Sequence, residues 1–302
     1  MKDNEIPLPP KERDFCWAES HTDRRKMRKI AIQGIKGSFH DIAAHQYFAG
    51  EELELVECAS FEALFDVLRK DDEALGLVAI ENTIAGSLLH NYELLRESGK
   101  TVVGEHKLHI EHALMCLPDD ELGDIREVNS HPVALAQCRG FLTRHSGMKI
   151  VEVEDTAGAA ERISREKLHG HAAICHADAA RLYGMRVLER SIEDNKHNYT
   201  RFLVLSDEKC ADTLRCAPQT TKASIVFATP HTEGALSQVL SIFTFYRINL
   251  SKIQSLPIIG REWQYLFYVD VCYDDYARYR QSIEAVRPLT KDFKILGEYA
   301  GK

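Results

Sequence analysis

The sequence predicts an α/β protein that carries a smaller, ferredoxin-like unit in its C-terminal part. Between residues 29 and 206, strand-like apolar runs alternate with helix-like segments, an order typical of α/β domains with largely parallel strands. From residue 222 onward the pattern becomes strand, helix, strand, strand, helix, strand, which is the βαββαβ order. The length of 302 residues agrees with two domains of about 100–200 residues each.

The first domain, at 29–206, is expected to have a central strand buried on both faces. The run at 75–81 is continuously apolar, as in such strands. Ser60 begins a helix in which Phe61, Leu64 and Leu68 fall on one face. Another helix is predicted at 38–48. The predicted strands are 29–34, 53–58, 75–81, 101–105, 113–117, 128–130, 149–153, 172–176 and 202–205.

The second domain, at 222–302, is predicted from its own periodicity. Leu236, Val239, Leu240 and Phe243 recur at helical spacing. The predicted helices are 234–248 and 279–286, and the predicted strands are 222–228, 250–255, 265–273 and 292–299.

Two polar segments are expected to lie outside the domains. Residues 1–28 contain Pro9-Pro10, have no apolar core of a secretory signal and include acidic residues, so we expect a flexible extension and a cytoplasmic location. Met27 directly precedes the first strand and is a candidate start of translation. Residues 207–221 are polar and are expected to form a linker.

Composition excludes several function classes. The net charge of −8 comes without a basic stripe, which argues against nucleic acid as a partner. No apolar run reaches about 18 residues, the length needed to span a membrane. The eight cysteines are scattered without a CxxC pair, so we expect free thiols in a reducing compartment.

A glycine turn, Gly34-Ile35-Lys36-Gly37, joins the first predicted strand to a helix that starts at Ser38. Helix N-termini favour anions, so an anion site is one interpretation. A tight turn that needs positive φ is the other, and is preferred for the motif taken alone. The spacing is not GxGxxG, which excludes a dinucleotide fingerprint.

Polar residues follow three predicted strands. They are Glu81-Asn82-Thr83 with Gly86-Ser87, then Ser130-His131-Pro132, then Asp155-Thr156-Ala157. Each group alone could simply cap a helix or form a turn. Because ligands of open α/β sheets bind at strand ends, three such groups favour one shared cleft.

The segment Asn198-Tyr199-Thr200-Arg201-Phe202 places a hydroxyl beside a guanidinium where a turn enters a strand. Arginine offers a fork of donors that matches a carboxylate, and threonine offers a short donor. This pair is suited to a small polyanionic substrate.

No metal and no cofactor is expected. His106 and His109 would face opposite sides of a strand, and His112 is too distant from His106 to share an ion with it, so we expect solvated strand histidines. Cys138 and Cys175 have no evident base partner and are interpreted as structural.

Together these motifs resemble those of the prephenate dehydratase family. The C-terminal unit resembles an ACT regulatory domain, and Gly234-Ala235-Leu236 matches the GAL motif of such domains. The resemblance covers about residues 29–300. The matching segments are 32–39, 81–83 with 86–87, 130–132 with 134–135 and 137–138, 155–157 and 194–202.

The resemblance implies a two-lobed, periplasmic-binding-protein-like catalytic domain that converts prephenate to phenylpyruvate with loss of CO2 and water. It implies that Thr200 hydrogen-bonds the leaving hydroxyl and that Arg201 orients a carboxylate, more readily that of the pyruvyl group. A threonine hydroxyl is too weak an acid to transfer its proton fully to the leaving hydroxyl at pH 7. The implied substrate-binding residues are Asn82, Thr83, Ser87, Ser130, His131, Thr156, Ala157, Asn198 and Phe202.

The resemblance also implies feedback by L-phenylalanine and assembly as a homodimer or homotetramer. The implied effector residues are Gly234, Ala235, Leu236, Asn249, Leu250, Gln254 and Ser255. Two departures bear on it: Gln254-Ser255-Leu256-Pro257 replaces Glu-Ser-Arg-Pro, and Gly34-Ile35-Lys36-Gly37 replaces Gly-Pro-Glu-Gly. Alternative functions are an arogenate dehydratase, a non-catalytic amino-acid sensor and a periplasmic-type binding protein.

Overall fold

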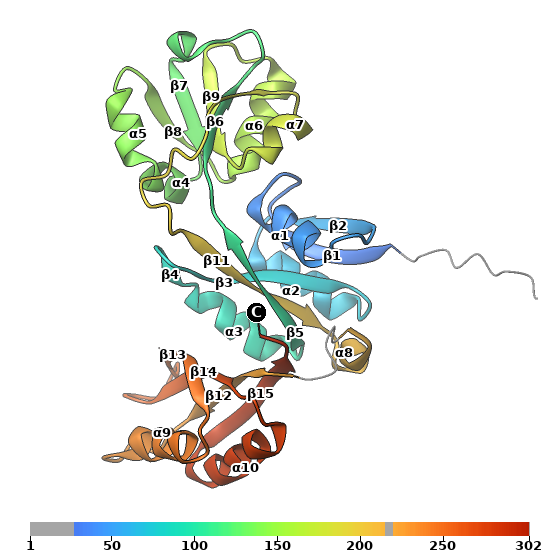
Figure 1. The fold of residues 1–302 in the computed structure, drawn as a ribbon, viewed down its shortest axis with the longest axis vertical. Helices are drawn as coiled ribbons and strands as arrows, with labels where there is room; N and C mark the ends of the chain where they lie inside the picture. Colours follow the sequence, from blue (N-terminus) through green and yellow to red (C-terminus); the bar gives the residue numbers. More distant parts are fainter. Residues whose placement is uncertain (1–26, 215–219, 302) are drawn as a thin grey trace, which may run out of the picture.

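The computed structural model describes residues 27–214 and 220–301. Three sheets follow one another along the long axis of the molecule, as Figure 1 shows. The upper two form the two lobes of an α/β unit, and the lowest belongs to the C-terminal domain. Residues 1–26, expected as an extension, lie outside the described residues.

The first lobe contains a mixed sheet of order β2-β1-β3-β11-β5, with β4 paired to β3. Strand β1 is parallel to β2 and β3, whereas β11 is antiparallel to β3 and β5. The strands are β1 (Arg28–Gln33), β2 (Leu53–Cys58), β3 (Leu75–Asn82), β4 (Gly86–Ser87), β5 (Thr101–His109) and β11 (Tyr199–Ser206). The helices are α1 (Phe39–Tyr47), α2 (Phe61–Lys70) and α3 (Leu89–Ser98).

The second lobe contains a sheet of order β10-β6-β9-β7-β8. Its strands are β6 (Ala113–Cys116), β7 (Glu127–Ser130), β8 (Lys149–Glu152), β9 (His171–Cys175) and β10 (Arg186–Glu189). Its helices are α4 (Pro132–Gln137), α5 (Arg139–Arg144), α6 (Thr156–Glu166) and α7 (Asp178–Leu182), with a 3-10 turn at Leu122–Asp124.

The expectation of largely parallel pairing is only half right. Strands β7, β8 and β9 are parallel, but β6 and β10 are antiparallel to their neighbours. The chain leaves the first lobe after β5 and returns to it as β11, which inserts between β3 and β5 (Figure 1). This return makes the central pairings of the first sheet antiparallel, and strand patterns alone do not reveal it.

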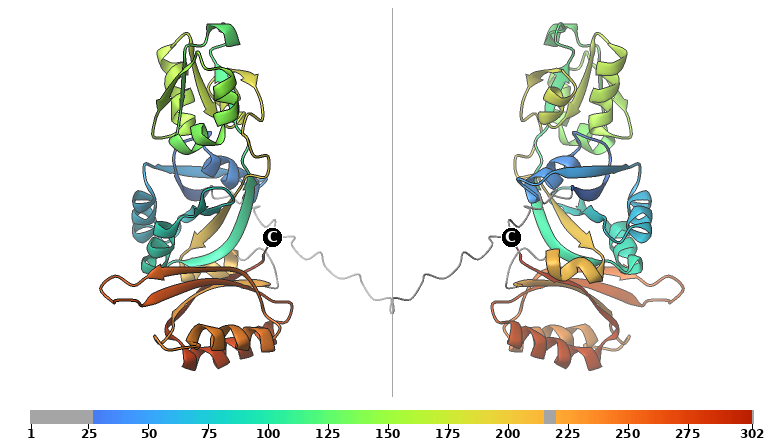
Figure 2. Two further views of the ribbon diagram at one scale, coloured as in Figure 1. Left: turned by 90° about the vertical axis from the view of Figure 1, so that its left-hand side faces the viewer. Right: turned by 90° about the vertical axis from the view of Figure 1, so that its right-hand side faces the viewer.

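The C-terminal domain has the predicted βαββαβ order and a sheet of order β13-β14-β12-β15. Figure 2 shows helices α9 and α10 on one face of this sheet and the first lobe on the other. Leu256, Tyr268 and Tyr299 of the sheet share one apolar cluster with Leu203 and Leu205 of β11. The elements are β12 (Lys222–Ala228), α9 (Ala235–Phe245), β13 (Asn249–Pro257), β14 (Tyr265–Cys272), α10 (Tyr276–Val286), a 3-10 turn (Arg287–Leu289) and β15 (Lys291–Tyr299).

The segment 207–221, expected as a linker, begins with a helix, α8 (Glu208–Leu214). Residues 215–219 lie outside the described residues. Within the described ranges, no helix is long and apolar enough to cross a membrane. Cys58, Cys116, Cys138, Cys175, Cys210 and Cys272 are free thiols.

Candidate functional site

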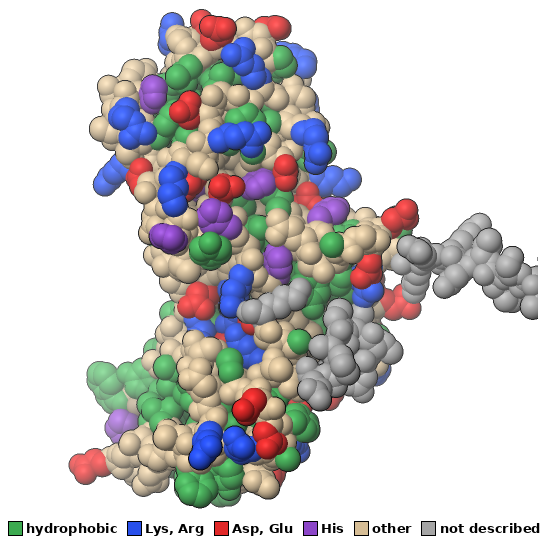
Figure 3. Space-filling view, viewed as in Figure 1, with side chains coloured by type: hydrophobic (Ala, Val, Ile, Leu, Met, Phe, Trp, Pro, Cys, Tyr) green, Lys and Arg blue, Asp and Glu red, His purple; other side chains and the backbone are tan. Residues whose placement is uncertain are grey.

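A cleft of about 500 Å3 lies between the two lobes. The three polar strand ends meet here, as expected: Asn82 comes from the first lobe, and His131 and Thr156 come from the second. In Figure 3, histidine side chains gather near the level where the lobes meet. Of the predicted site residues, those that line the cleft are Asn82, Ser87, His131, Thr156, Thr200 and Phe202.

Five helices begin at this cleft. Residues of their first turns or N-caps line it, namely Phe39 of α1, Phe61 of α2, Leu88 before α3, His131 before α4 and Thr156 of α6. Helix N-termini present free backbone N–H groups and the positive end of the helix dipole. No lysine or arginine is among the described residues that line the cleft. These N-termini offer backbone donors to a carboxylate, but Glu62, Glu154 and Asp155 also line the cleft, and Asp155 already accepts from the N–H of Gly158 in α6 (2.6 Å).

The orientation of the Asn82 side chain follows from its partners. Its Oδ1 accepts hydrogen bonds from the backbone N–H groups of Ile84 (2.9 Å) and Ala85 (2.8 Å). Its Nδ2 therefore faces the other way, and donates to Asn198 Oδ1 (2.8 Å) and to Thr200 Oγ1 (3.0 Å). Since Thr200 Oγ1 is an acceptor toward Asn82, its own proton is available to donate into the cleft.

The hydrogen bonds of Asn82 continue through Asn198 to Gln137 and His112. Asn198 Nδ2 donates to Gln137 Oε1 (2.9 Å), and His112 Nε2 lies 2.9 Å from the same oxygen. Because an amide oxygen can only accept, His112 carries its proton on Nε2. The expectation of a solvated His112 is wrong: the side chain is buried, and burial lowers its pKa. Gln137 and His112 line the cleft and were missed as site residues.

His40 is a further cleft residue that sequence reasoning missed. Its ring stands edge-on to Phe202, with centroids 4.9 Å apart, and its Nε2 accepts from the backbone N–H of Ala79 (3.4 Å). Burial lowers its pKa to about 3, so the ring is neutral and adds no positive charge to the cleft. The sequence signal that could have identified His40 is its position on the buried face of α1, because helical periodicity marks that face.

Arg201 does not line the cleft, which corrects its expected role. Successive residues of a strand face opposite sides, so Thr200 and Phe202 point into the cleft and Arg201 points toward the C-terminal domain. Its Nε donates to Glu105 Oε2 (2.7 Å), and its Nη1 binds the carboxylate of Asp270. Burial alone would lower the pKa of Arg201. The two carboxylates outweigh this effect, so the net pKa lies above its ordinary value.

Four other expected contact residues lie beside the cleft without lining it. Ser130 is fully buried and donates to the carbonyl of Ile174 (2.5 Å). Ala157 is buried inside α6, and Asn198 is buried behind Asn82. Thr83 faces away, where its Oγ1 accepts from the backbone N–H of Tyr199 (2.9 Å).

The glycine loop forms a tight turn that contacts the second lobe. Gly34 and Gly37 have φ of +94° and +83°, a conformation that other residues rarely adopt. A Cβ on Gly34 would lie 2.9 Å from Asp155 Oδ2, and the carbonyl of Lys36 accepts from Tyr183 Oη (2.5 Å). The loop thus joins the lobes at the edge of the cleft.

Cys138 and Cys175 are not activated as nucleophiles. Burial raises the pKa of both Cys138 and Cys175, which keeps them protonated. Within the described residues, no three His, Cys, Asp or Glu side chains are grouped so as to hold a metal ion.

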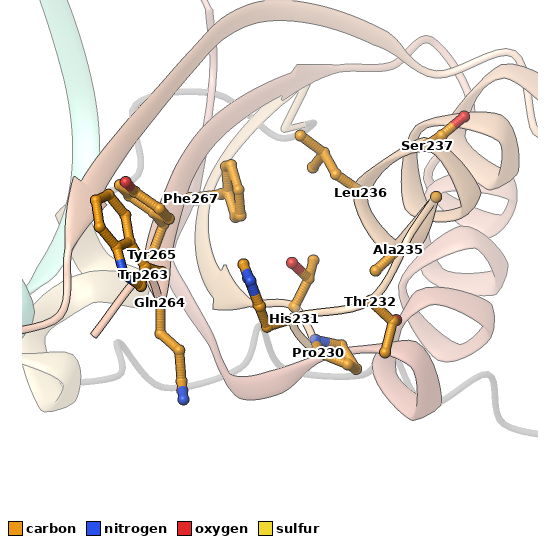
Figure 4. Close-up of a pocket in the computed structure, with 12 residues that line it drawn as sticks. Pro230, His231, Thr232, Ala235, Leu236, Ser237, Trp263, Gln264, Tyr265 and Phe267 are labelled. Carbon is orange, nitrogen blue, oxygen red and sulfur yellow. The ribbon is translucent and has the colours of Figure 1, made fainter. Parts of the chain in front are cut away.

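A smaller pocket of about 290 Å3 lies in the C-terminal domain. Figure 4 shows Ala235 and Leu236 at the start of α9 on one side of it, and Trp263 and Tyr265 on the opposite side. Of the expected effector residues, Gly234, Ala235 and Leu236 line this pocket. Asn249, Leu250, Gln254 and Ser255 do not.

Comparisons with known proteins identify the family of the chain. The family model described as "PDT: Prephenate dehydratase" matches residues 30–210. The chain is 34% identical over 273 residues to the Arabidopsis thaliana protein "Arogenate dehydratase/prephenate dehydratase 2, chloroplastic", covering 87% of this chain and 70% of that protein. It is 32% identical over 274 residues to the "Bifunctional chorismate mutase/prephenate dehydratase" of Escherichia coli (strain K12), with coverages of 90% and 70%.

Two solved structures show the same architecture. A prephenate dehydratase from Arthrobacter aurescens in complex with L-Phe superposes with a TM-score of 0.79 at 25% identity, covering 90% of both chains. A protein described as GqqA, a novel type of quorum-quenching acylase, superposes with a TM-score of 0.78 at 30% identity, covering 91% of this chain and 98% of that one.

Proposed function

The chain belongs to the prephenate dehydratase family, and on this premise we propose that it converts prephenate to phenylpyruvate in L-phenylalanine biosynthesis. The observation that carries the proposal is the Asn82–Thr200 hydrogen bond of 3.0 Å at a cleft where five helices begin. The bond leaves a hydroxyl proton of Thr200 free to donate into the cleft.

The reaction breaks two bonds that join substituents to the ring. The bond from the ring to its carboxylate breaks and releases CO2, and its electron pair moves through the ring diene to expel the hydroxyl group opposite. That group leaves with one proton as water, and the ring becomes aromatic. The Thr200 hydroxyl donates a hydrogen bond to the departing oxygen, and a proton from solvent completes the water molecule. Such a donor stabilises charge that develops only in the transition state.

Backbone donors replace Arg201 as the proposed carboxylate ligands. The helix N-termini at Phe39, Phe61 and Thr156 can bind the pyruvyl carboxylate. A strong ion pair with the ring carboxylate would stabilise the substrate against decarboxylation, and no described lysine or arginine of the cleft makes one. Asn82, Ser87, His131, Thr156 and Phe202 are the proposed substrate contacts.

We further propose that the C-terminal domain is an ACT-type regulatory domain that binds L-phenylalanine beside Ala235 and Leu236. The solved relative from A. aurescens in complex with L-Phe supports this assignment. Phe245, Ile259 and Trp263 are 81%, 90% and 72% exposed, and Figure 3 shows apolar side chains gathered over β13 and β14. Exposed apolar patches mark interfaces, so we propose assembly through this domain. The free thiols fit a cytoplasmic location.

One assay tests the function. Purified protein is given prephenate or arogenate, and phenylpyruvate or phenylalanine is measured, with and without L-phenylalanine. Turnover of prephenate, inhibited by L-phenylalanine, is the expected result. Turnover of arogenate alone would assign the other dehydratase, and binding of L-phenylalanine without turnover of either would indicate a sensor.

A further inference from the structure

Two cross-strand charge pairs face one another where the C-terminal sheet packs on the first lobe. In the first lobe, Arg201 of β11 lies opposite Glu81 of β3. In the C-terminal sheet, Lys252 of β13 lies opposite Asp270 of β14. Across the interface these two pairs meet with unlike charges: Lys252 Nζ lies 2.9 Å from Glu81 Oε1, and Arg201 Nη1 binds Asp270.

Three of these four charges are largely withdrawn from solvent, whereas the side chain of Glu81 is 36% exposed. The side chains of Lys252, Asp270 and Arg201 are 8%, 6% and 10% exposed. Buried ion pairs gain little net stability, because desolvation offsets their attraction, yet they are costly to misalign. The four charges are therefore suited to define the relative position of the two sheets.

Arg201 and Glu81, the pair in the first lobe, are each one residue away from a residue that lines the cleft. Thr200 lies opposite Asn82 in the same ladder that pairs Arg201 with Glu81. A register shift leaves Ile80 without a partner between β3 and β11, so Ala79 and Asn82 both line the cleft. A displacement of Glu81 or Arg201 must therefore move the Asn82–Thr200 hydrogen bond.

Lys252 also reaches a cleft residue directly. Its Nζ donates to Ser87 Oγ (2.8 Å) and lies 5.5 Å from the ring centroid of Tyr92. Ser87 lines the cleft at the β3–β4 hairpin. A residue of the C-terminal domain thus holds one wall of the proposed catalytic site.

The opposite ends of the same strands reach the smaller pocket. Phe267 lines that pocket three residues before Asp270 on β14. Thr229 lines it directly after β12, and β12 also carries Ser224, whose Oγ donates to Asp270 Oδ1 (2.5 Å). Two strands therefore connect the pocket to the charge pairs.

We propose that Lys252 and Asp270 are positioning residues through which the C-terminal domain aligns Asn82, Thr200 and Ser87 for catalysis. Where L-phenylalanine alters the C-terminal sheet, the same contacts transmit the change to the cleft. The second statement rests on the proposed effector function, whereas the first does not need it. A coupling claim of this kind requires direct measurement.

The test is a double-mutant cycle with Lys252→Met and Glu81→Gln, together with Lys252→Arg and a control, Lys294→Met. Lys294 also joins the C-terminal sheet to the first lobe, but its hydrogen bond goes to the carbonyl of Arg96 on α3 (3.2 Å) and not to a residue of β3 or β11. The readouts are kcat, KM, melting temperature, the affinity for L-phenylalanine by calorimetry, and the inhibition at saturation.

We expect Lys252→Met to lower kcat at least fivefold with KM changed less than twofold. Glu81→Gln should act similarly, and the double variant should fall no further than the worse single variant. L-phenylalanine should still bind Lys252→Met within about threefold of its normal affinity, yet inhibit it less than half as far. Lys252→Arg should restore most of kcat, and Lys294→Met should keep both kcat and inhibition.

Several results would overturn the proposal. The first is a Lys252→Met protein whose kcat and inhibition stay within twofold of the parent. The second is a loss of kcat or inhibition in Lys294→Met that equals the loss in Lys252→Met. The third is a double variant in which the losses of kcat from Lys252→Met and Glu81→Gln are additive. A Lys252→Met protein that does not fold leaves the test to Glu81→Gln, whose unchanged kcat would reject the link. Failure of the parent to bind L-phenylalanine would refute only the effector assignment.

Discussion

The hydroxyl of Thr200 is the sharpest test of the proposed chemistry. Thr200→Val keeps the shape of the side chain and removes its donor. The variant costs Asn82 Nδ2 one acceptor, but Asn198 Oδ1 (2.8 Å) and the carbonyl of Tyr199 (3.2 Å) remain as partners. Because one partly buried hydrogen bond contributes about 1 kcal/mol, the folded state should survive with a loss of at most that size.

The effect on rate should be much larger. Removing one donor to an oxygen that gains charge in a transition state typically costs about 10²–10³ in kcat, or about 2.7–4 kcal/mol. Phenylpyruvate formation should therefore show this loss in kcat with KM changed less than threefold, the mark of an interaction made mainly in the transition state. Thr200→Ser keeps the donor and should retain most of the activity.

Thr83→Val is the matched control. Thr83 also bonds to the loop that precedes β11, donating to the carbonyl of His197 (3.1 Å) and accepting from the N–H of Tyr199, but it lies outside the cleft. Its loss should lower stability and leave kcat within about threefold. An equal fall in kcat for both variants, or a Thr200→Val protein changed only in KM, would refute the proposed role of the Thr200 hydroxyl.

Three further predictions follow from single contacts. Ser130→Ala should lower the free energy of unfolding by about 1–2 kcal/mol, because it removes a buried donor to Ile174; a fall in kcat at unchanged stability would instead favour substrate contact. His40 has a folded pKa of about 3, below its unfolded value of 6.5. The unfolded chain thus binds the extra proton as pH falls from 6.5 toward 3, and about 2 kcal/mol of stability should be lost at pH 5 relative to pH 8. His40→Gln should remove that part of the slope in urea titrations, and an unchanged slope would contradict the assignment. Ala235→Trp should fill the pocket beside α9 and abolish the roughly 2.7 kcal/mol that L-phenylalanine at 100 times its Kd should add; Ser241→Trp, exposed on the same helix, is the control and should keep the thermal shift.

The prediction of a shared cleft succeeded because strand ends and helix starts are local signals. Asn82, His131 and Thr156 each follow a strand, and the structure brings all three to one cleft. Gln137 and His112 were missed because their role depends on a network whose members are far apart along the chain. The return of β11 into the first sheet was missed for the same reason, since its partners β3 and β5 lie about 100 residues earlier.

The misplacement of Arg201 has a different cause. A guanidinium beside a hydroxyl suggests one site when read as neighbouring letters, but neighbouring residues of a strand face opposite sides. The structure shows this alternation, because Phe202 and Val204 belong to one apolar cluster and Leu203 and Leu205 to another. The sequence does not show it, because all four residues are apolar. What the sequence could not show is that a second domain covers the far face with Asp270.

This alternation explains why a donor for catalysis and a buried cation are adjacent. Strand β11 is the layer between the cleft and the C-terminal sheet, so one residue step changes the surface that a side chain faces. An apolar residue at position 201 could pack against the apolar cluster that includes Tyr299 in many alignments, because apolar contacts have little direction. A guanidinium bound by Glu105, Asp270 and the hydroxyl of Tyr299 (3.0 Å) accepts essentially one alignment. A misaligned guanidinium would be buried without these partners, which is costly. The charges therefore favour a single position of Thr200 relative to the domain that is proposed to regulate it.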